Sequence, residues 1–143
     1  MIRGEMEVNG MALEDLKPGD EESQSIVVAP AHFASVIVPG TPDVFSTASL
    51  CALVEKTAAD WMAPHLAAGQ MTVGAQIVID HTAATPEGMT ITATVTLEGG
   101  DGRRFDFRWT AHDGVEECGH GTHRRFVVDG DRFRQRLAGK VTT

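Results

Sequence analysis

An alternation of apolar with polar or small residues runs from residue 70 to residue 81. Successive side chains on a β-strand point to opposite faces, so this stretch predicts a strand with one apolar face turned toward a core. That face would carry Val73, Ala75, Ile77, Ile79 and His81, and the opposite face would carry Gly74, Gln76, Val78 and Asp80. His81 would lie at the edge of the core, either as a packed structural histidine or as a base at the lip of a pocket.

Four further segments are typical of strands, because they are rich in β-branched and aromatic residues and are bounded by turn residues. Two of the junctions, at 99–102 and 112–114, are short enough for antiparallel hairpins. Residues 30–43, which contain prolines and a glycine, predict a turn or helical stub followed by a loop. The predicted strands are 23–29, 70–81, 89–99, 103–113 and 116–129.

The only long helix candidate covers residues 43–66. Asp43 could cap its start, and Ala63-Pro64 would end it. Apolar or small residues lie nearly all round this helix, which is typical of a buried helix. A second, basic helix could end the chain at residues 130–140.

One buried helix followed by an antiparallel meander predicts an α+β fold in which the sheet wraps around the helix, the hotdog arrangement. A single sheet of this kind leaves an open edge, so we expect the chain to pair into a homodimer. The length of 143 residues allows one domain with its own core. We expect an N-terminal arm over residues 1–20 and a single domain over residues 21–143.

Charge and cysteine content narrow the expected partners and location. The formal net charge of −8 argues against a nucleic-acid partner. Residues 101–143 nevertheless hold 9 Lys and Arg against 7 Asp and Glu, so a small phosphorylated ligand could find a basic patch there. No apolar run or signal-peptide pattern predicts a membrane or export segment. Cys51 and Cys118 do not form a disulfide framework, so we expect a cytoplasmic protein.

Glu55 is an acidic residue within the apolar stretch of the helix candidate. Residues four apart share a helix face, so Thr47, Cys51 and Glu55 form one stripe. A buried carboxylate needs polar partners, so Glu55 lies either on an exposed edge beside Lys56 or in a functional site. If Glu55 and Thr47 converge on His81, the carboxylate can orient the imidazole and the imidazole can act as a general base.

Two other positions suggest contacts with a ligand. Gly74 lies inside a predicted strand, where a glycine marks either a β-bulge or the close approach of a backbone or ligand. In the second case its N–H could donate to a developing oxyanion. Arg124 and Arg125 alternate faces, so one of them could pair with a phosphate, unless both are simply solvated.

Cys118, His120 and His123 raise the alternative of a metal site. Cys118 and His120 share a strand face that His123 does not share unless a glycine bends the strand, so we expect no metal. The sequence also lacks the serine-hydrolase elbow, the phosphate-binding loop, the dinucleotide fingerprint and the zinc-protease motif. These absences remove the main support for the corresponding enzyme classes.

Three stretches resemble the fluoroacetyl-CoA thioesterase family of the hotdog superfamily: VFSTASLCALVEKTAADWMAPHL, HTAATPEGMTITATVTLE and GRRFDFRWTAHDGVEECGHGTHRR. The resemblance covers roughly residues 24–137. It implies a homodimer that hydrolyses a short-chain acyl-CoA and needs no cofactor. The catalytic threonine, glutamate and histidine of the family match Thr47, Glu55 and His81. Its active-site glycine matches Gly74, and its arginine near the coenzyme matches Arg125.

One segment departs from the family. The fluoroacetyl enzyme carries a lid with two phenylalanines between the first strand and the helix, whereas this chain has only Phe33 and Phe45 there. Weak or absent fluoroacetyl selectivity is therefore expected. Two alternatives stay open: a non-catalytic protein that binds acyl-CoA or another small molecule, and an enoyl-CoA hydratase or dehydratase. The second would need a histidine beside Asp43, and none neighbours it in the sequence.

Overall fold

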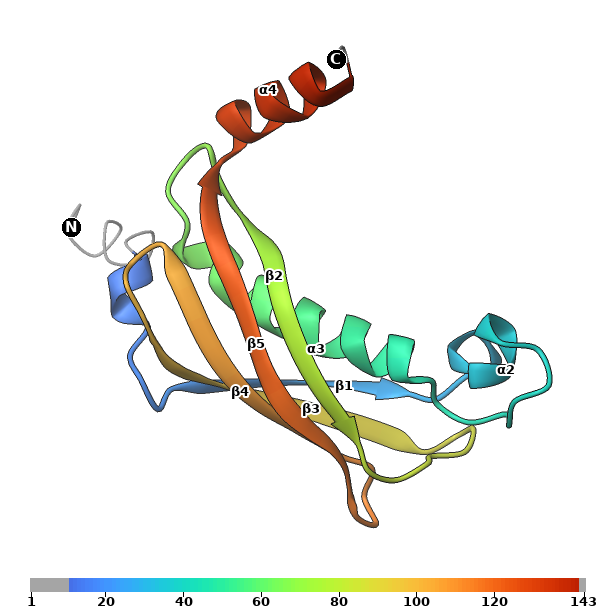
Figure 1. Cartoon of the computed structure of the whole chain (residues 1–143). Helices are drawn as coiled ribbons and strands as arrows, with labels where there is room; N and C mark the ends of the chain where they lie inside the picture. The colour runs from blue at the N-terminus through green and yellow to red at the C-terminus, as the bar shows by residue number, and fades with distance from the viewer. Residues whose placement is uncertain (1–10, 142–143) are drawn as a thin grey trace, which may run out of the picture.

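Five antiparallel strands form one sheet that curls around a long helix (Figure 1). The computed structural model describes residues 11–141. The predicted α+β fold is confirmed, and each predicted strand is present. The strands are β1 (Glu21–Val27), β2 (Gln70–His81), β3 (Thr90–Gly100), β4 (Arg104–His112) and β5 (Glu117–Asp129). The helices are α2 (Ala34–Ile37), α3 (Thr47–Met62) and α4 (Gly130–Val141), with 3-10 turns at Leu13–Asp15, Pro30–His32 and Ala63–His65.

The strand order is β1-β3-β4-β5-β2, so β1 and β2 are the two edges of the sheet. The hairpins predicted between β3, β4 and β5 are present, but β2 pairs with β5 instead of β3. The prediction of a simple meander was wrong at this point. The connection at residues 82–89 carries the chain across the curled sheet, and local strand patterns do not specify which strands pair.

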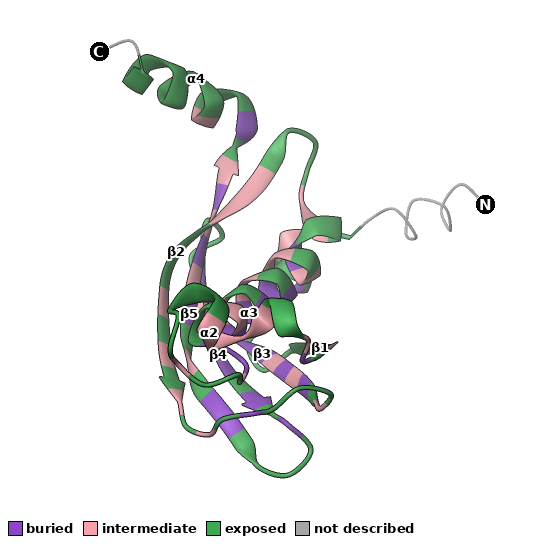
Figure 2. Ribbon diagram, turned by 90° about the vertical axis from the view of Figure 1, so that its right-hand side faces the viewer, coloured by how far each residue is buried: buried purple, intermediate pink, exposed green. Residues whose placement is uncertain are grey.

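α3 packs one face against the concave side of the sheet (Figure 2). Its apolar residues recur three or four positions apart and therefore lie on one side of the helix. Every second residue of β3 from Ile91 to Leu97 and of β4 from Phe105 to Ala111 is buried beneath that side. The other side of α3 is exposed at Ala48, Ala52, Lys56 and Asp60. The expectation of a helix buried nearly all round was therefore wrong for a single chain.

Ser46, and not Asp43, caps the start of α3. The Ser46 hydroxyl accepts a hydrogen bond from the Ser49 backbone N–H at 3.0 Å. Asp43 instead accepts a hydrogen bond from Ser35 Oγ at 2.6 Å, outside the helix. The helix therefore begins at Thr47, the first candidate catalytic residue, and the cap fixes the position of that residue.

A β-bulge between Gly74 and Gln76 interrupts the alternation of β2. Gly74 lies opposite Arg125, and Ile77 lies opposite His123, with both partners buried on the concave side. The extra residue places Gly74 on the same face as Ile77. The faces predicted for residues 73–75 from strict alternation were therefore wrong, because the bulge shifts them by one position.

The two ends of the described chain differ in their packing. Residues 1–10 of the N-terminal arm predicted over 1–20 lie outside the described residues. In the remaining part of that arm, Leu16 is buried. Asp20 and Gly19 form backbone hydrogen bonds with Leu97, at 2.9 and 2.8 Å respectively. α4 projects from the end of β5, away from the sheet (Figure 1). No described helix is long and apolar enough to cross a membrane.

Candidate active site

Thr47 and His81 form a hydrogen-bonded pair at one end of α3. Thr47 Oγ1 lies 2.8 Å from His81 Nδ1. Their elements meet because the loop before α3 is bonded to the loop after β2: the Phe45 N–H donates to the Thr85 carbonyl at 2.9 Å. The buried Thr85 hydroxyl in turn donates to Asp113 at 2.8 Å. The segment HTAAT therefore anchors the turn that presents His81 to Thr47.

His81 is suited to act as a base. Burial lowers the pKa of His81 from its ordinary value of 6.5, so the neutral ring dominates at neutral pH. Its Nδ1 can accept the proton of the Thr47 hydroxyl across the 2.8 Å contact. Nε2 is buried and has no hydrogen-bond partner among the described residues. A buried N–H without a hydrogen-bond partner is costly, so we expect His81 Nε2 to donate to a polar group that lies outside the single chain.

A shallow pocket of about 310 Å³ opens beside this pair. Small or apolar side chains line it, with Thr47 and His81 as its reactive groups. α2, the loop before α3 and the turn after β2 each contribute. The lining residues are Ala34, Val44, Phe45, Thr47, His81, Thr82, Ala83 and Ala84.

Glu55 lies two helical turns beyond Thr47, about 12 Å along the helix axis. It is half-exposed, and Cys51 Sγ lies 3.6 Å from its Oε1. Burial, together with the charge of Glu55, raises the pKa of the Cys51 thiol, so the thiol stays protonated and can donate. The other carboxylate oxygen, Oε2, lies 3.7 Å from Arg125 Nη1. No contact joins Glu55 to His81 within the described chain, so the three predicted catalytic residues form two separate groups.

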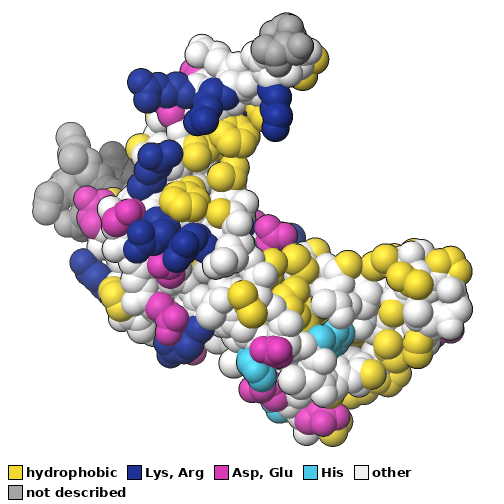
Figure 3. Space-filling model, viewed as in Figure 1, with side chains coloured by type: hydrophobic (Ala, Val, Ile, Leu, Met, Phe, Trp, Pro, Cys, Tyr) yellow, Lys and Arg dark blue, Asp and Glu magenta, His cyan; other side chains and the backbone are white. Residues whose placement is uncertain are grey.

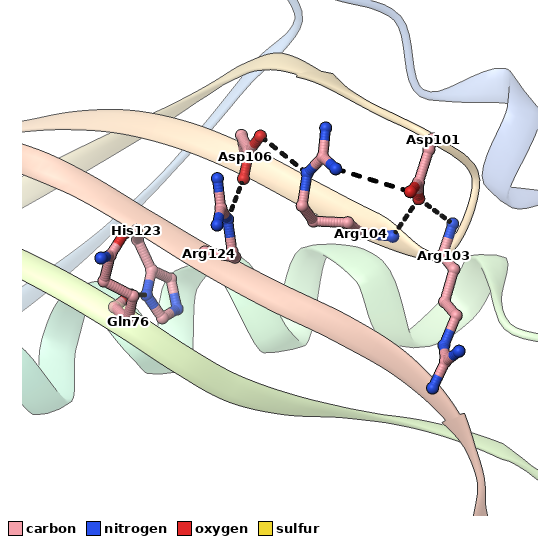
Figure 4. A network of polar contacts seen from close by, with 7 residues as sticks. All are labelled: Gln76, Asp101, Arg103, Arg104, Asp106, His123 and Arg124. Atoms are coloured by element: carbon pink, nitrogen blue, oxygen red, sulfur yellow. Dashed lines mark hydrogen bonds and ion pairs between the residues drawn. The ribbon is translucent and has the colours of Figure 1, made fainter.

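Arg125 is buried on the concave side and directed at Glu55. Its Nε and Nη2 donate to Thr72 Oγ1 at 3.2 and 3.1 Å. Its Nη1 donates to His123 Nε2 at 3.3 Å. Arg124 faces the outside of the sheet and donates to Asp106 at 2.7 Å (Figure 4). Both guanidinium groups are therefore engaged with the protein, and neither geometry favours the phosphate-binding alternative.

His123 orders the group formed by Glu55 and Arg125, a role that is not predicted from the sequence. Its Nδ1 must donate to the Gln76 carbonyl, 2.8 Å away, because a carbonyl can only accept. Nε2 is then the acceptor for Arg125. Burial lowers the pKa of His123, which keeps the ring in this neutral form. Strand alternation could have revealed the relation, since His123 and Arg125 are two residues apart on one face.

Gly74 shows both of the features proposed for it, a bulge and a close approach. A Cβ atom at this position would lie 2.5 Å from Glu55 Oε2 and 3.1 Å from Arg125 Nη1. Only a glycine leaves room for the carboxylate and the guanidinium in this arrangement. The bulge and the Glu55–Arg125 ion pair thus meet at the same residue.

The residues considered for a metal site are separated. His120 is exposed and lies 3.0 Å from Glu117 and 3.5 Å from Asp80, whereas His123 is buried on the concave side. Cys118 is also buried. The described part of the chain contains no group of three residues that could hold a metal ion.

Comparison with known proteins agrees with the geometry of the fold. Residues 28–131 match a family described as fluoroacetyl-CoA-specific thioesterase. The fluoroacetyl-CoA thioesterase of Streptantibioticus cattleyicolor is 35% identical over 134 residues, covering 90% of this chain and 96% of that protein. A solved structure of a fluoroacetyl-CoA thioesterase superposes with a TM-score of 0.83 at 36% identity, covering 87% of this chain and 97% of the other.

A hot-dog-like protein from Thermanaerovibrio acidaminovorans has the same TM-score of 0.83 at 21% identity and supports the fold alone. It covers 89% of this chain and 94% of that chain. Thr47, Glu55, Gly74, His81 and Arg125 all lie within the matched range of residues 28–131. The family resemblance inferred from the sequence is confirmed, and the chain belongs to the fluoroacetyl-CoA-specific thioesterase family.

Proposed function

We propose that the protein hydrolyses a short-chain acyl-CoA thioester to the free acid and CoA. The observation that carries this proposal is the 2.8 Å contact between Thr47 and His81 at the edge of a small apolar pocket. A neutral imidazole next to a hydroxyl can act as the general base that activates the hydroxyl, or a water molecule beside it, for attack on a thioester. Membership of a thioesterase family supports the same chemistry.

Two routes fit this pair. In one, Thr47 Oγ attacks the thioester carbonyl, its proton passes to His81 Nδ1, and the CoA sulfur leaves and takes up that proton. Water then hydrolyses the acyl-threonine. In the other, His81 takes the proton from a water molecule that attacks the carbonyl directly, and Thr47 orients that water. Detection of an acylated Thr47 by mass spectrometry after rapid quenching favours the first route.

The second group of residues, formed by Glu55, Gly74 and Arg125, supports substrate binding next to the reacting thioester. We assign Gly74 and Arg125 to the wall of the site next to the thioester. We assign Glu55 to stabilising the positive charge that forms on His81 when the ring takes up a proton. Arg125 is too enclosed for a role at the phosphates in this arrangement, since 6% of its surface is exposed. It holds the Glu55 carboxylate instead, and the carboxylate is then fixed relative to Gly74.

A homodimer joins the two groups. β2 is an edge strand with a half-exposed Val78, and unpaired strand edges favour pairing with another strand. Antiparallel pairing of β2 with a second copy about a two-fold axis near residues 77 and 78 brings His81 of one chain toward the partner's Gly74 and Glu55. The buried Nε2 of His81 supports this proposal, because it needs a partner that its own chain does not supply.

The shallow pocket beside Thr47 and His81 fits a short acyl group, and its lining favours weak selectivity for fluoroacetyl esters. Three of its eight lining residues are alanines, Ala34, Ala83 and Ala84, and these small side chains leave room for a few carbon atoms. Phe45 is packed in the core, with 1% of its surface exposed, and forms an isolated bridge with Phe33. It is therefore not free to act as a mobile lid. Free thiols at Cys51 and Cys118 and a CoA substrate favour a cytoplasmic location.

The test is release of free thiol from acetyl-, fluoroacetyl-, propionyl-, short branched and aromatic acyl-CoA by the wild type and His81→Ala. We expect turnover of short esters by the wild type, a loss of about 10²- to 10⁴-fold in the variant, and similar rates for acetyl and fluoroacetyl esters. Binding of CoA without turnover of any ester would favour the non-catalytic alternative. The hydratase alternative gains no support, because among the described residues Asp43 is hydrogen-bonded by Ser35 and by no histidine.

A further inference from the structure

Another cavity lies far from Thr47 and His81, at the junction of β5 and α4. Its volume is about 710 Å³, compared with about 310 Å³ beside the catalytic pair. Val127, Val128 and Phe133 contribute its apolar part, and Arg103, Arg132 and Arg136 its charge. We call this cavity the α4 pocket. Figure 3 shows Lys and Arg side chains around an apolar patch in the hollow beneath α4.

The three arginines of the α4 pocket differ from the other described arginines. Arg104 and Arg124 pair with Asp106, Arg108 pairs with Glu98, Arg125 with Glu55, and Arg134 with Asp131. Among the described residues, the arginines without a carboxylate partner all line this one pocket, and they are Arg103, Arg132 and Arg136.

The surroundings of these arginines leave their guanidinium groups available. Figure 4 shows Arg103 bonded to Asp101 through its backbone N–H, while its side chain extends away from that carboxylate. Asp129 also lines the pocket, but its carboxylate accepts the Arg132 backbone N–H at 2.9 Å and caps α4. A concentration of free positive charge is unexpected in a chain with a net charge of −8.

The chemistry of the pocket fits a ligand with several phosphates and a flat ring. Guanidinium groups form strong, often paired hydrogen bonds to phosphate oxygens. Phe133 and the two valines offer a surface on which a ring can pack. The volume falls within the usual range of about 300–1,000 Å³ for small-molecule sites. These properties together match the nucleotide part of a coenzyme better than a simple anion.

The pocket is close to the group formed by Glu55, Gly74 and Arg125. It is lined by the last three residues of β5 and so lies at the end of the sheet. Arg125 precedes Val128 on the same strand by about 10 Å. In the dimer proposed above, the partner's His81 would meet this end of the chain, and one pantetheine arm could connect the thioester to the pocket.

We propose that the α4 pocket binds the 3′-phosphorylated ADP half of the CoA thioester. This inference rests on the proposed thioesterase function and adds the residues that recognise the coenzyme. The first test measures binding of adenosine 3′,5′-bisphosphate by calorimetry. We expect binding by the wild type that weakens as salt is added, and at least a tenfold loss in the triple variant Arg103→Ala, Arg132→Ala, Arg136→Ala.

Arg108→Ala is the matched control, because Arg108 is an exposed arginine of the same sheet that is paired with Glu98. It should bind the bisphosphate as the wild type does. A loss of binding in the control as large as that in the triple variant would overturn the proposal, since the effect would then come from overall charge. Equally strong binding of inorganic phosphate would also overturn it, since the site would not recognise a nucleotide.

The second test compares two esters with the same acyl group, acetyl-CoA and acetyl-N-acetylcysteamine, which lacks the nucleotide. The triple variant should raise the KM for acetyl-CoA by about tenfold or more, with kcat and the kinetics of the short ester unchanged. An unchanged KM, or equal losses with both esters, would overturn the proposal. If the wild type hydrolyses no ester, the proposed function fails, and the calorimetry still decides whether the pocket binds the nucleotide.

Discussion

The absence of a side chain at Gly74 leaves the space that Glu55 Oε2 and Arg125 Nη1 occupy. We expect Gly74→Ala to displace this ion pair, because the new Cβ would lie 2.5 Å from the carboxylate oxygen. The expected result is a kcat lower by about 10- to 100-fold, with a loss of at most about 1 kcal/mol in the free energy of unfolding, because Glu55 Oε2 is the end of a flexible, half-exposed side chain that can move aside. Steady-state kinetics and urea denaturation measure the two effects.

Gly99→Ala is the control for this prediction. Gly99 also lies in a strand at a register shift, but a Cβ there would have no atom within 4 Å. Its kcat should equal that of the wild type, and its stability should change by less than about 0.5 kcal/mol. Equal kcat values for Gly74→Ala and the wild type would show that the Glu55–Arg125 pair does not serve catalysis.

The burial of the His81 ring predicts how kcat/KM depends on pH. Because burial lowers its pKa below 6.5, His81 stays neutral and able to accept a proton in moderately acidic solution. The acidic limb of kcat/KM should therefore have its midpoint below pH 6.5. An NMR titration of the histidine ring protons, with the His81 signals assigned by comparison with His81→Gln, should also give a pKa below 6.5 for His81. A midpoint above 6.5 would contradict the prediction and would mean that the charge of the partner's Glu55 in the proposed dimer raises the pKa of His81 by more than burial lowers it.

Linkage gives the matching prediction for stability. His81 and His123 both have lowered pKa values in the folded chain, so below pH 6.5 the unfolded chain binds protons that the folded chain does not. These two histidines should make the free energy of unfolding decrease as the pH falls through 6.5 toward their folded pKa values. Urea denaturation of the wild type and His123→Gln between pH 7.5 and 5.5 measures the slope, which should be smaller in the variant.

At the scale of elements, the cap of α3 connects helix stability to the site. Ser46→Ala should lower the free energy of unfolding by about 1 kcal/mol, because it removes the acceptor for the Ser49 N–H. It should also reduce kcat, since Thr47 is the first residue of the helix. Asp43→Ala, which changes the residue that sequence reasoning favoured as the cap, is the control and should leave both quantities near the wild type.

At the scale of the whole molecule, the separation of Thr47 and His81 from Glu55 predicts a site shared between two chains. Co-expression of His81→Ala and Glu55→Ala chains with different tags allows the mixed dimer to be purified. That dimer should regain up to about half of the wild-type activity, because one of its two sites combines intact His81 with the partner's intact Glu55. Activity assays on the mixed dimer and on each variant alone provide the comparison.

The mixed dimer also distinguishes the alternatives. If each site were contained in one chain, both sites would carry a defect, and the mixed dimer would be as inactive as its parents. Failure of the two tags to purify together would instead contradict the dimer itself.

Much of the fold follows from the sequence, because local patterns determine local structure. Alternation gave β2 from residue 70 to residue 81, and the short polar junctions gave the β3–β4–β5 hairpins. Residue type also identified Thr47, Glu55 and His81 as candidates. These features depend on neighbouring residues, whose side chains and turns have strong preferences of their own.

The tertiary structure decided which of these residues meet. The crossover that pairs β2 with β5, the bulge beside Gly74 and the capping of α3 by Ser46 depend on contacts between distant segments. So does the role of Arg125, whose buried guanidinium points to Glu55. The sequence by itself determined the strands, the central helix and the reactive residue types. Only packing decided their partners, because burial and hydrogen bonding must be satisfied over the whole chain at once.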